Sequence, residues 1–243
     1  MTEKLSVELE SVRDNYLRVV ERAERAAANS GFHTPVTICA ATKTVAPEII
    51  NYTAELGLRT MGENRVQELM AKYDFLDARL DRQFIGTLQT NKLKYLVDRV
   101  SLIQSLNSIH AAATLDRLCR ERNKTMRVLI EINSGREPEK SGILPEALDE
   151  FLDQMRAFDH VIVQGLMTIG PNCAEKSSYF LIFEETYKLF IDIYRKKLHN
   201  IDKPILSMGM SDNFEIAIAC GATMIRPGSA IYGHRPPMAK NEN

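Results

Sequence analysis

Residues 36–57 read VTICAATKTVAPEIINYTAELG, and this stretch contains the unit from which the fold is built. Its first part, Val36–Ala41, is a short apolar run of the kind that forms a buried strand. Pro47 then opens a segment with apolar residues at helical spacing, and proline is favoured in the first turn of a helix. A buried strand followed directly by an amphipathic helix is typical of parallel α/β folds.

The same order of strand and helix recurs along the whole chain. Strands are predicted at Val36–Ala41, Arg59–Met61, Gln83–Ile85, Leu102–Gln104, Arg127–Ile132, Val161–Met167, Ile205–Met208 and Met224–Arg226. Helices are predicted between them at Pro47–Leu56, Arg65–Lys72, Asn91–Val97, Ser108–Arg122, Pro145–Phe158, Lys176–Leu198 and Asn213–Ala219. Units of this kind, repeated without a change in composition, favour a closed (β/α)8 barrel over an open doubly wound sheet.

A further helix precedes the first strand. Over residues 3–28, apolar side chains recur every three or four positions and form one stripe, and Asn29-Ser30-Gly31 ends the pattern. The chain has 243 residues, which fits one α/β barrel of about 200–250 residues. No linker rich in Pro, Gly or Ser divides it, so we expect residues 1–243 to form a single domain.

Charge and cysteine content exclude several classes of function. The 31 basic and 32 acidic residues nearly cancel, which argues against nucleic acid or a membrane as the main partner. Four cysteines, at 39, 119, 173 and 220, are too far apart for a Cys-x-x-Cys motif, and the five histidines have no metal-ligand spacing. With no signal peptide or spanning segment in the sequence, we expect a cytoplasmic protein without a metal.

Lys43 lies just after the first predicted strand. An ammonium group there is expected to meet a partly dry environment, which favours the neutral amine and makes it a candidate to attack an aldehyde. The alternative is an ordinary lysine whose stem packs at a strand end while its charge reaches water.

Two loops near the end of the chain have the composition of a phosphate site. In a barrel, phosphate is often held by the loops after strands seven and eight. The first loop offers Ser207, Met208 and Gly209 as candidate binding residues; the second offers Arg226, Gly228 and Ser229. Hydroxyl groups, glycines and free backbone N–H groups before a helix favour an anion, although such residues also serve as ordinary caps and turns. An amine and a phosphate site at one end of a barrel together suggest pyridoxal phosphate (PLP).

Polar residues also follow the other predicted strands. Asn64 and Asn133 could line a pocket or could be turn residues. Lys140, before Ser141-Gly142, could be a second basic position or a solvated lysine.

A series of short motifs resembles the pyridoxal phosphate homeostasis family, which is related to the alanine racemase amino-terminal barrel. The motifs are Ala41-Thr42-Lys43-Thr44, Gly62-Glu63-Asn64, Phe84-Ile85-Gly86-x-Leu88-Gln89-x-Asn91-Lys92, Lys140-Ser141-Gly142, Gly165-Leu166-Met167, Ser207-Met208-Gly209-Met210-Ser211-Asp212 and Arg226-Pro227-Gly228-Ser229. The resemblance runs from about residue 35 to residue 233. One departure is Gln83, where the family motif usually opens with histidine.

The resemblance implies a barrel that holds PLP as a Schiff base on Lys43. By the same resemblance, Ser207, Gly228 and Ser229 fall where the phosphate is held, and Arg226 falls where the pyridine nitrogen is faced. An arginine offers only donors, so the ring nitrogen would stay unprotonated and the ring would be a poor electron sink. The resemblance therefore implies a carrier or regulator of vitamin B6 rather than an enzyme.

Two alternatives are a racemase-like PLP enzyme acting on a small amino acid and a Schiff-base aldolase acting on a phosphorylated sugar. A racemase needs a second acid or base, for which Cys173 and Tyr232 are weak candidates. The carboxy-terminal domain with which alanine racemases supply that group is expected to be missing. We expect a monomer whose partners are PLP and apo PLP-dependent enzymes.

Overall fold

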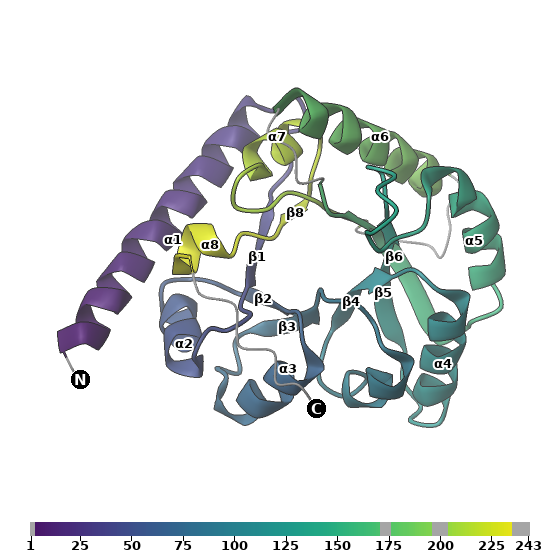
Figure 1. Cartoon of the computed structure of the whole chain (residues 1–243), viewed down its shortest axis with the longest axis horizontal. Coiled ribbons are helices and arrows are strands. Elements are labelled where there is room, and N and C mark those ends of the chain that lie inside the picture. The colour runs from purple at the N-terminus through teal and green to yellow at the C-terminus, as the bar shows by residue number, and fades with distance from the viewer. Residues whose placement is uncertain (1–2, 171–175, 196–203, 235–243) are drawn as a thin grey trace.

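The computed structural model describes residues 3–170, 176–195 and 204–234. Eight parallel strands follow one another around a closed barrel in sequence order, and the last pairs with the first (Figure 1). The strands are β1 Thr37–Ala41, β2 Thr60–Glu63, β3 Asp81–Phe84, β4 Leu102–Leu106, β5 Met126–Ile132, β6 Val161–Thr168, β7 Ile205–Ser207 and β8 Met224–Ile225. The predicted (β/α)8 barrel is confirmed.

Helices connect the strands and cover the outside of the barrel (Figure 1). They are α2 Pro47–Glu55, α3 Val66–Lys72, α4 Ile109–Arg120, α5 Leu148–Met155, α6 Lys176–Arg195, α7 Phe214–Ala219 and α8 Ser229–Tyr232. Short 3-10 turns lie at η1 Tyr73–Phe75, η2 Thr90–Tyr95 and η3 Pro145–Ala147. Within the described ranges, no helix is both long and apolar enough to cross a membrane.

The predicted extra helix is α1, Glu3–Asn29, which lies along the outside of the barrel beside α7 and α8 (Figure 1). Its apolar stripe is buried at Val12, Tyr16, Val19 and Ala23. Arg22 binds the carboxylate of Glu215 on α7 through Nε and Nη2, at 3.1 and 2.8 Å. This helix therefore joins the first part of the chain to the last.

Three details differ from the expected elements. Residues 90–95 form a 3-10 turn where an α-helix was predicted over 91–97. The helix expected from Pro145 opens with the 3-10 turn η3 and becomes α-helical at Leu148. The sequence did not predict α8, because its residues were interpreted as a phosphate-binding loop.

Most of the apolar core lies between the barrel and its helices, while the interior of the barrel is mixed in character. Two small apolar clusters fill part of it: Cys39, Ile85 and Met224 form one, and Leu102, Leu129 and Met167 form the other. Buried polar side chains of Gln83, Gln104 and Ser207 occupy other interior positions. Polar side chains are thus built into the middle of the barrel, below its carboxyl-end loops.

Candidate functional site

A cavity of about 510 Å³ opens at the carboxyl ends of the strands. It brings together five of the eight predicted binding residues: Lys43, Asn64, Arg226, Gly228 and Ser229. They come from the loops after β1, β2 and β8, which are neighbours in the barrel. The segment after β7 completes one wall through residues 210–212. The cavity therefore combines an amine, a guanidinium group, an amide and hydroxyl groups at the end of the barrel where ligands usually bind.

The other three predicted residues, Ser207, Met208 and Gly209, are not brought to the cavity lining. Ser207 and Met208 are fully buried. Gly209 has φ +93°, and a Cβ there would come within 2.6 Å of the Cβ of Ala217 on α7. A tight backbone turn thus carries the chain past these three residues, and the cavity is lined by the three that follow.

Lys43 does not lie in the partly dry environment expected from the sequence. Its side chain is exposed, because the lysine lies in the turn after β1 rather than in the strand. Among the described residues, none forms a hydrogen bond or ion pair with the Lys43 side chain. The amine is thus free at the cavity wall, but burial does not activate it.

The backbone beside Lys43 is held in a strained conformation. Thr44 has φ +60°, a left-handed value that is rare for a β-branched residue. Its N–H donates to Oε2 of Glu68 on α3 at 2.7 Å. This hydrogen bond fixes the turn from which Lys43 projects.

The carboxylate of Glu68 belongs to a buried ionic cluster beneath the turn. Lys72 Nζ lies 2.9 Å from Glu63 Oε2 and 3.4 Å from Glu68 Oε2, and it also donates to the carbonyl of Thr42 at 3.0 Å. Burial raises the pKa of Glu63, and the nearby Lys72 ammonium opposes that rise. The cluster ties the ends of β1 and β2 to α3, and it therefore supports two walls of the cavity.

Arg226 forms the buried floor of the cavity. Its Nη1 donates to Ser207 Oγ at 2.6 Å, and its Nη2 donates to the carbonyl of Thr168 at 2.8 Å. Its residue is 4% exposed. Burial lowers the pKa of Arg226 to about 10, so the guanidinium group is still charged at neutral pH.

Glu131 on β5 is a second buried ionisable group near Arg226. Asn107 donates to its Oε2 at 2.9 Å. Burial raises the pKa of Glu131 to about 7, while the Asn107 hydrogen bond and the charge of Arg226 oppose that rise. This carboxyl group titrates near neutral pH, close to the guanidinium charge.

The two predicted phosphate loops are joined to each other by Ser211. Its Oγ accepts hydrogen bonds from the backbone N–H groups of Gly228 at 3.1 Å and Ala230 at 3.0 Å. Gly228 also packs closely on β1, since a Cβ there would lie 3.2 Å from the Cβ of Ala41. Ser211 thus takes up two backbone N–H groups of the second loop, and the hydroxyl groups of Ser211 and Ser229 are both found in the lining of the cavity.

Asn64 has a side-chain oxygen that suits a ligand. Its Oδ1 is buried and has no hydrogen-bond partner within the described part of the chain. The backbone of Asn64 is fixed by Gly86, where a Cβ would collide with the Asn64 carbonyl oxygen at 1.9 Å. An unsatisfied buried amide at a cavity wall is the kind of group that a bound molecule would satisfy.

Other residues singled out in the sequence lie elsewhere. Asn133 is a turn residue, since its side chain exchanges hydrogen bonds with the backbone of Glu137. Lys140 is outside the cavity lining and donates to Glu137 Oε1 at 2.6 Å and to the Gly170 carbonyl at 3.2 Å. Tyr232 does line the cavity, with its hydroxyl 3.1 Å from Thr53 Oγ1. Cys173 lies outside the described residues.

Sequence reasoning missed Ser211, Glu68 and Lys72. Ser211 lies in the same quoted motif as Ser207, but a motif does not show which hydroxyl faces the cavity. Glu68 and Lys72 are four residues apart on a predicted helix, a spacing that indicates a side-chain pair. The sequence carried no signal that this pair would be buried against Glu63.

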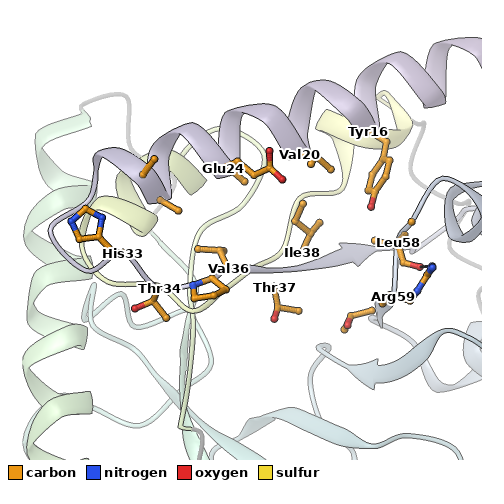
Figure 2. A pocket seen from close by; sticks show the side chains of 16 residues that line it. Tyr16, Val20, Glu24, His33, Thr34, Val36, Thr37, Ile38, Leu58 and Arg59 are labelled. Carbon is orange, nitrogen blue, oxygen red and sulfur yellow. Dashed lines mark hydrogen bonds between the residues drawn. The ribbon is translucent and has the colours of Figure 1, made fainter.

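A larger cavity, of about 620 Å³, lies at the opposite end of the barrel (Figure 2). Residues of α1 form one wall, and the segments leading into β1 and β2 form the other. Glu24 and Arg59 lie far apart along it, and Arg59 Nη1 already donates to the carbonyls of Ala54 and Leu58. No lysine lines it among the described residues. It thus lacks the amine and the paired loops of the carboxyl-end cavity.

The described residues contain no group of three or more His, Cys, Asp or Glu side chains placed to hold a metal ion.

Comparison with known proteins identifies the family. The family model of the alanine racemase N-terminal domain matches residues 7–236. A pyridoxal phosphate homeostasis protein from Aquifex aeolicus is 40% identical over 220 residues, which is 90% of this chain and 96% of that protein. A protein of unknown function from Bifidobacterium adolescentis has the same fold, with a TM-score of 0.86 and 31% identity over 95% of this chain and 97% of its own.

A third relative was solved with its cofactor. PipY of Synechococcus elongatus, with PLP bound, has a TM-score of 0.74 and 29% identity, covering 82% of this chain and 92% of PipY. These likenesses extend over nearly the whole barrel and include the strands that bear the cavity. The chain belongs to the pyridoxal phosphate homeostasis family, whose barrel is that of the alanine racemase amino-terminal domain.

Proposed function

We propose that the chain binds PLP in the carboxyl-end cavity and takes part in vitamin B6 homeostasis without catalysing a reaction of amino acids. The observation that carries this proposal is the meeting of Lys43, Arg226 and the joined loops of Ser211 and Gly228 in one cavity. The name of the Aquifex relative and the PLP bound to PipY support it.

The residues present fit this cofactor. The Lys43 amine would bond to the aldehyde carbon, while the hydroxyl groups of Ser211 and Ser229 would hold the phosphate beside Gly228, which has no side chain to obstruct it. Arg226 would face the ring nitrogen, and the unsatisfied Oδ1 of Asn64 marks a further polar contact. Bound PLP supplies an aldehyde that condenses with amines and a ring that withdraws electrons when its nitrogen is protonated.

In this proposal Ser207 supports Arg226 instead of holding phosphate. The Ser207 hydroxyl is buried and already bonded to Arg226 and Gln104. Met208 and Gly209 likewise shape the turn that places Ser211, and they make no side-chain contact with the ligand. The proposal thus keeps five of the predicted binding residues and reassigns three to the support of the site.

The donors and bases around the cavity support a protein that does not catalyse a reaction of amino acids. A guanidinium group donates hydrogen bonds and accepts none, so a ring nitrogen facing Arg226 stays unprotonated. A racemase also needs a second acid or base near the α-carbon. Tyr232 is the candidate that the sequence offered, and its hydroxyl is already within hydrogen-bond distance of Thr53.

We further propose that residues 1–243 act as one domain and that the protein works in the cytoplasm as a monomer. In this proposal it passes PLP to apo PLP-dependent enzymes. Light scattering after size-exclusion chromatography tests the monomer, and transfer of PLP to a defined apo-enzyme tests the delivery.

The test of cofactor binding is direct. Protein reconstituted with PLP is expected to be yellow, and reduction with borohydride followed by peptide mapping is expected to place the adduct on the Lys43 peptide. The chain contains no tryptophan, so no indole absorption or emission overlaps that of the cofactor. An adduct confined to Lys140 or Lys92 would contradict the proposed site.

The Ser229→Ala variant is expected to bind PLP more weakly by about 1–3 kcal/mol, the range for a lost hydrogen bond to a charged group. The control ligand is pyridoxal, which has no phosphate. Its affinity should change little in the variant, because Ser229 is proposed to contact only the phosphate. An equal loss for both ligands in equilibrium dialysis would place Ser229 elsewhere on the cofactor.

A racemase-like enzyme is the alternative function, and the shared barrel and the position of Tyr232 favour it. Measuring the turnover of amino acids distinguishes this enzyme from a carrier. Incubation with D- or L-alanine, serine or aspartate is expected to give no racemisation or transamination above that of free PLP. Chiral chromatography provides the measurement. Turnover of any of them at about 1 per second or faster, the ordinary enzymatic range, would favour the racemase-like function.

A further inference from the structure

A continuous row of hydrogen bonds crosses the interior of the barrel and ends on Arg226. Arg226 Nη1 donates to Ser207 Oγ at 2.6 Å, and Ser207 Oγ donates to Gln104 Oε1 at 2.6 Å. Gln104 Nε2 donates to Gln83 Oε1 at 2.6 Å, and Gln83 Nε2 donates to Asp81 Oδ2 at 2.7 Å. The row therefore links the cavity floor to a carboxylate at the start of β3.

The members of this row come from four strands or strand ends, and all except the half-buried Asp81 are shielded from water. Gln83 and Arg226 are each 4% exposed, and Gln104 and Ser207 are 0% exposed. The sulfur of Met224 lies 3.2 Å from Gln104 Nε2. In such surroundings a polar group that loses its partner cannot turn to solvent instead, so each link depends on the next.

The direction of every hydrogen bond in the row is fixed by its two ends. The guanidinium group of Arg226 can only donate, and the ionised carboxylate of Asp81 can only accept. Gln83 must therefore present its NH2 to Asp81 and its oxygen to Gln104. Gln104 must then present its NH2 to Gln83 and its oxygen to Ser207, which leaves the lone pairs of Ser207 for Arg226.

We propose that Gln83 and Gln104 are positioning residues for Arg226, which they orient towards a bound ligand through Ser207. The inference rests on the proposed function, in which Arg226 faces the ring nitrogen of PLP. Among the described residues, no carboxylate forms an ion pair with the guanidinium group, and the nearby Glu131 acts on it through its charge without a hydrogen bond. Its orientation thus depends on neutral acceptors, Ser207 and the Thr168 carbonyl.

In this arrangement Gln83 and Gln104 help to orient Arg226, although they lie away from the cavity. Neither lines the cavity. Nη1 and Nη2 of Arg226 each donate one hydrogen bond to an acceptor of the protein, which fixes the guanidinium plane. The remaining N–H groups are available to a ligand. Breaking the row at Gln104 would free Ser207 to rotate, and Arg226 would lose the acceptor that sets its plane.

The experiment compares PLP with its 1-deaza analogue, in which a C–H group replaces the ring nitrogen. The unchanged protein is expected to prefer PLP, because only PLP can accept a hydrogen bond from Arg226. In Gln104→Leu, this preference is expected to fall at least about threefold, a part of one hydrogen bond to a charged group. Leu129→Met, a volume-conserving change in the same barrel interior, is the matched control and should keep the full preference.

A second pair of variants tests the row at Gln83. Gln83→His keeps one donor and one acceptor when the imidazole is neutral, so at pH 8 it should retain the preference for PLP. Gln83→Leu removes both and should lower the preference as Gln104→Leu does. The ratio of the two affinities reports on the ring nitrogen, which a general loss of packing would not change.

The outcomes separate this inference from the proposed function. If the unchanged protein binds no PLP, the proposed function is wrong and this inference falls with it. If it binds PLP and both leucine variants keep the full preference over the 1-deaza analogue, the positioning role alone is wrong. If neither leucine variant folds while Leu129→Met does, the row is purely structural and the inference is likewise overturned.

Discussion

Replacing Lys43 with alanine is expected to abolish covalent retention of PLP and to leave the stability of the fold unchanged. The lysine is exposed and bonds to none of the described residues, so its removal breaks no packing or ion pair. Affinity for PLP should fall about 100-fold or more, which corresponds to about 2.7 kcal/mol. Absorption spectroscopy after desalting measures retention, and thermal unfolding followed by circular dichroism measures stability.

The matched control is Lys140→Ala, which removes another loop lysine outside the cavity. It should retain yellow, borohydride-reducible cofactor at the level of the unchanged protein. Some reversible binding should survive in Lys43→Ala, because the phosphate corner and Arg226 are intact. Undiminished covalent labelling of Lys43→Ala, or loss of labelling in Lys140→Ala alone, would show that another amine carries the cofactor.

The Lys72→Met variant is expected to lose about 3–5 kcal/mol of unfolding free energy at pH 8, the usual cost of leaving a buried charge without its partner. Glu63 is fully buried and has Lys72 as its ammonium partner at 2.9 Å. Without Lys72, its carboxylate must either remain charged in the interior or take up a proton. The turn that carries Lys43 should loosen as well, since Glu68 loses the same partner.

The loss of unfolding free energy in Lys72→Met is expected to increase as the pH rises. Burial already raises the pKa of Glu63, and losing Lys72 raises it further. A carboxyl group whose folded pKa exceeds its unfolded pKa stabilises the fold below the unfolded value, and this stability is lost as pH rises through the folded value. The variant should therefore be closest to the unchanged protein near pH 5 and furthest from it at pH 8.

Urea denaturation followed by far-ultraviolet circular dichroism at both pH values provides the measurement. The control is Lys188→Met, which removes a lysine from an exposed pair with Glu184 at 3.2 Å and should cost less than about 1 kcal/mol. An equal cost for the two variants at pH 8, or no change with pH, would show that the ammonium of Lys72 does not balance the buried charge of Glu63.

The course of the chain was predictable because strand formation depends on local apolar runs. Every expected strand is present, including the short ones near residues 60 and 83. The ends of the strands were less predictable. β2 continues through Gly62 and Glu63, whereas the predicted strand ended at Met61. A carboxylate is rarely buried without a charged partner, and the sequence pattern did not show that Lys72 is the partner of Glu63.

The candidate site was predictable as a set of loops but not as a set of contacts. Position along the barrel placed Lys43, Gly228 and Ser229 at one end. It could not show that Ser207 points into the interior while Ser211 lines the cavity, because that depends on where β7 ends and on the turn at Gly209. The strand before Lys43 ends at Ala41 as predicted, but the sequence could not show that the turn after it leaves the Lys43 side chain exposed.

The pairing of β8 with β1 has a consequence for biosynthesis. Thr37 and Ile38 pair with Met224 and Ile225, and Asn15 of α1 donates to the carbonyl of Ile231 in α8 at 3.3 Å. During translation, β1 leaves the ribosome long before β8 is made. The edge of β1 that pairs with β8 therefore stays unpaired until almost the whole chain has been synthesised. Open strand edges and contacts of long sequence separation slow folding and favour association between nascent chains. The amphipathic α1 packs against α2, α7 and α8 in the finished fold, so two of these three helices are also missing until the end of synthesis.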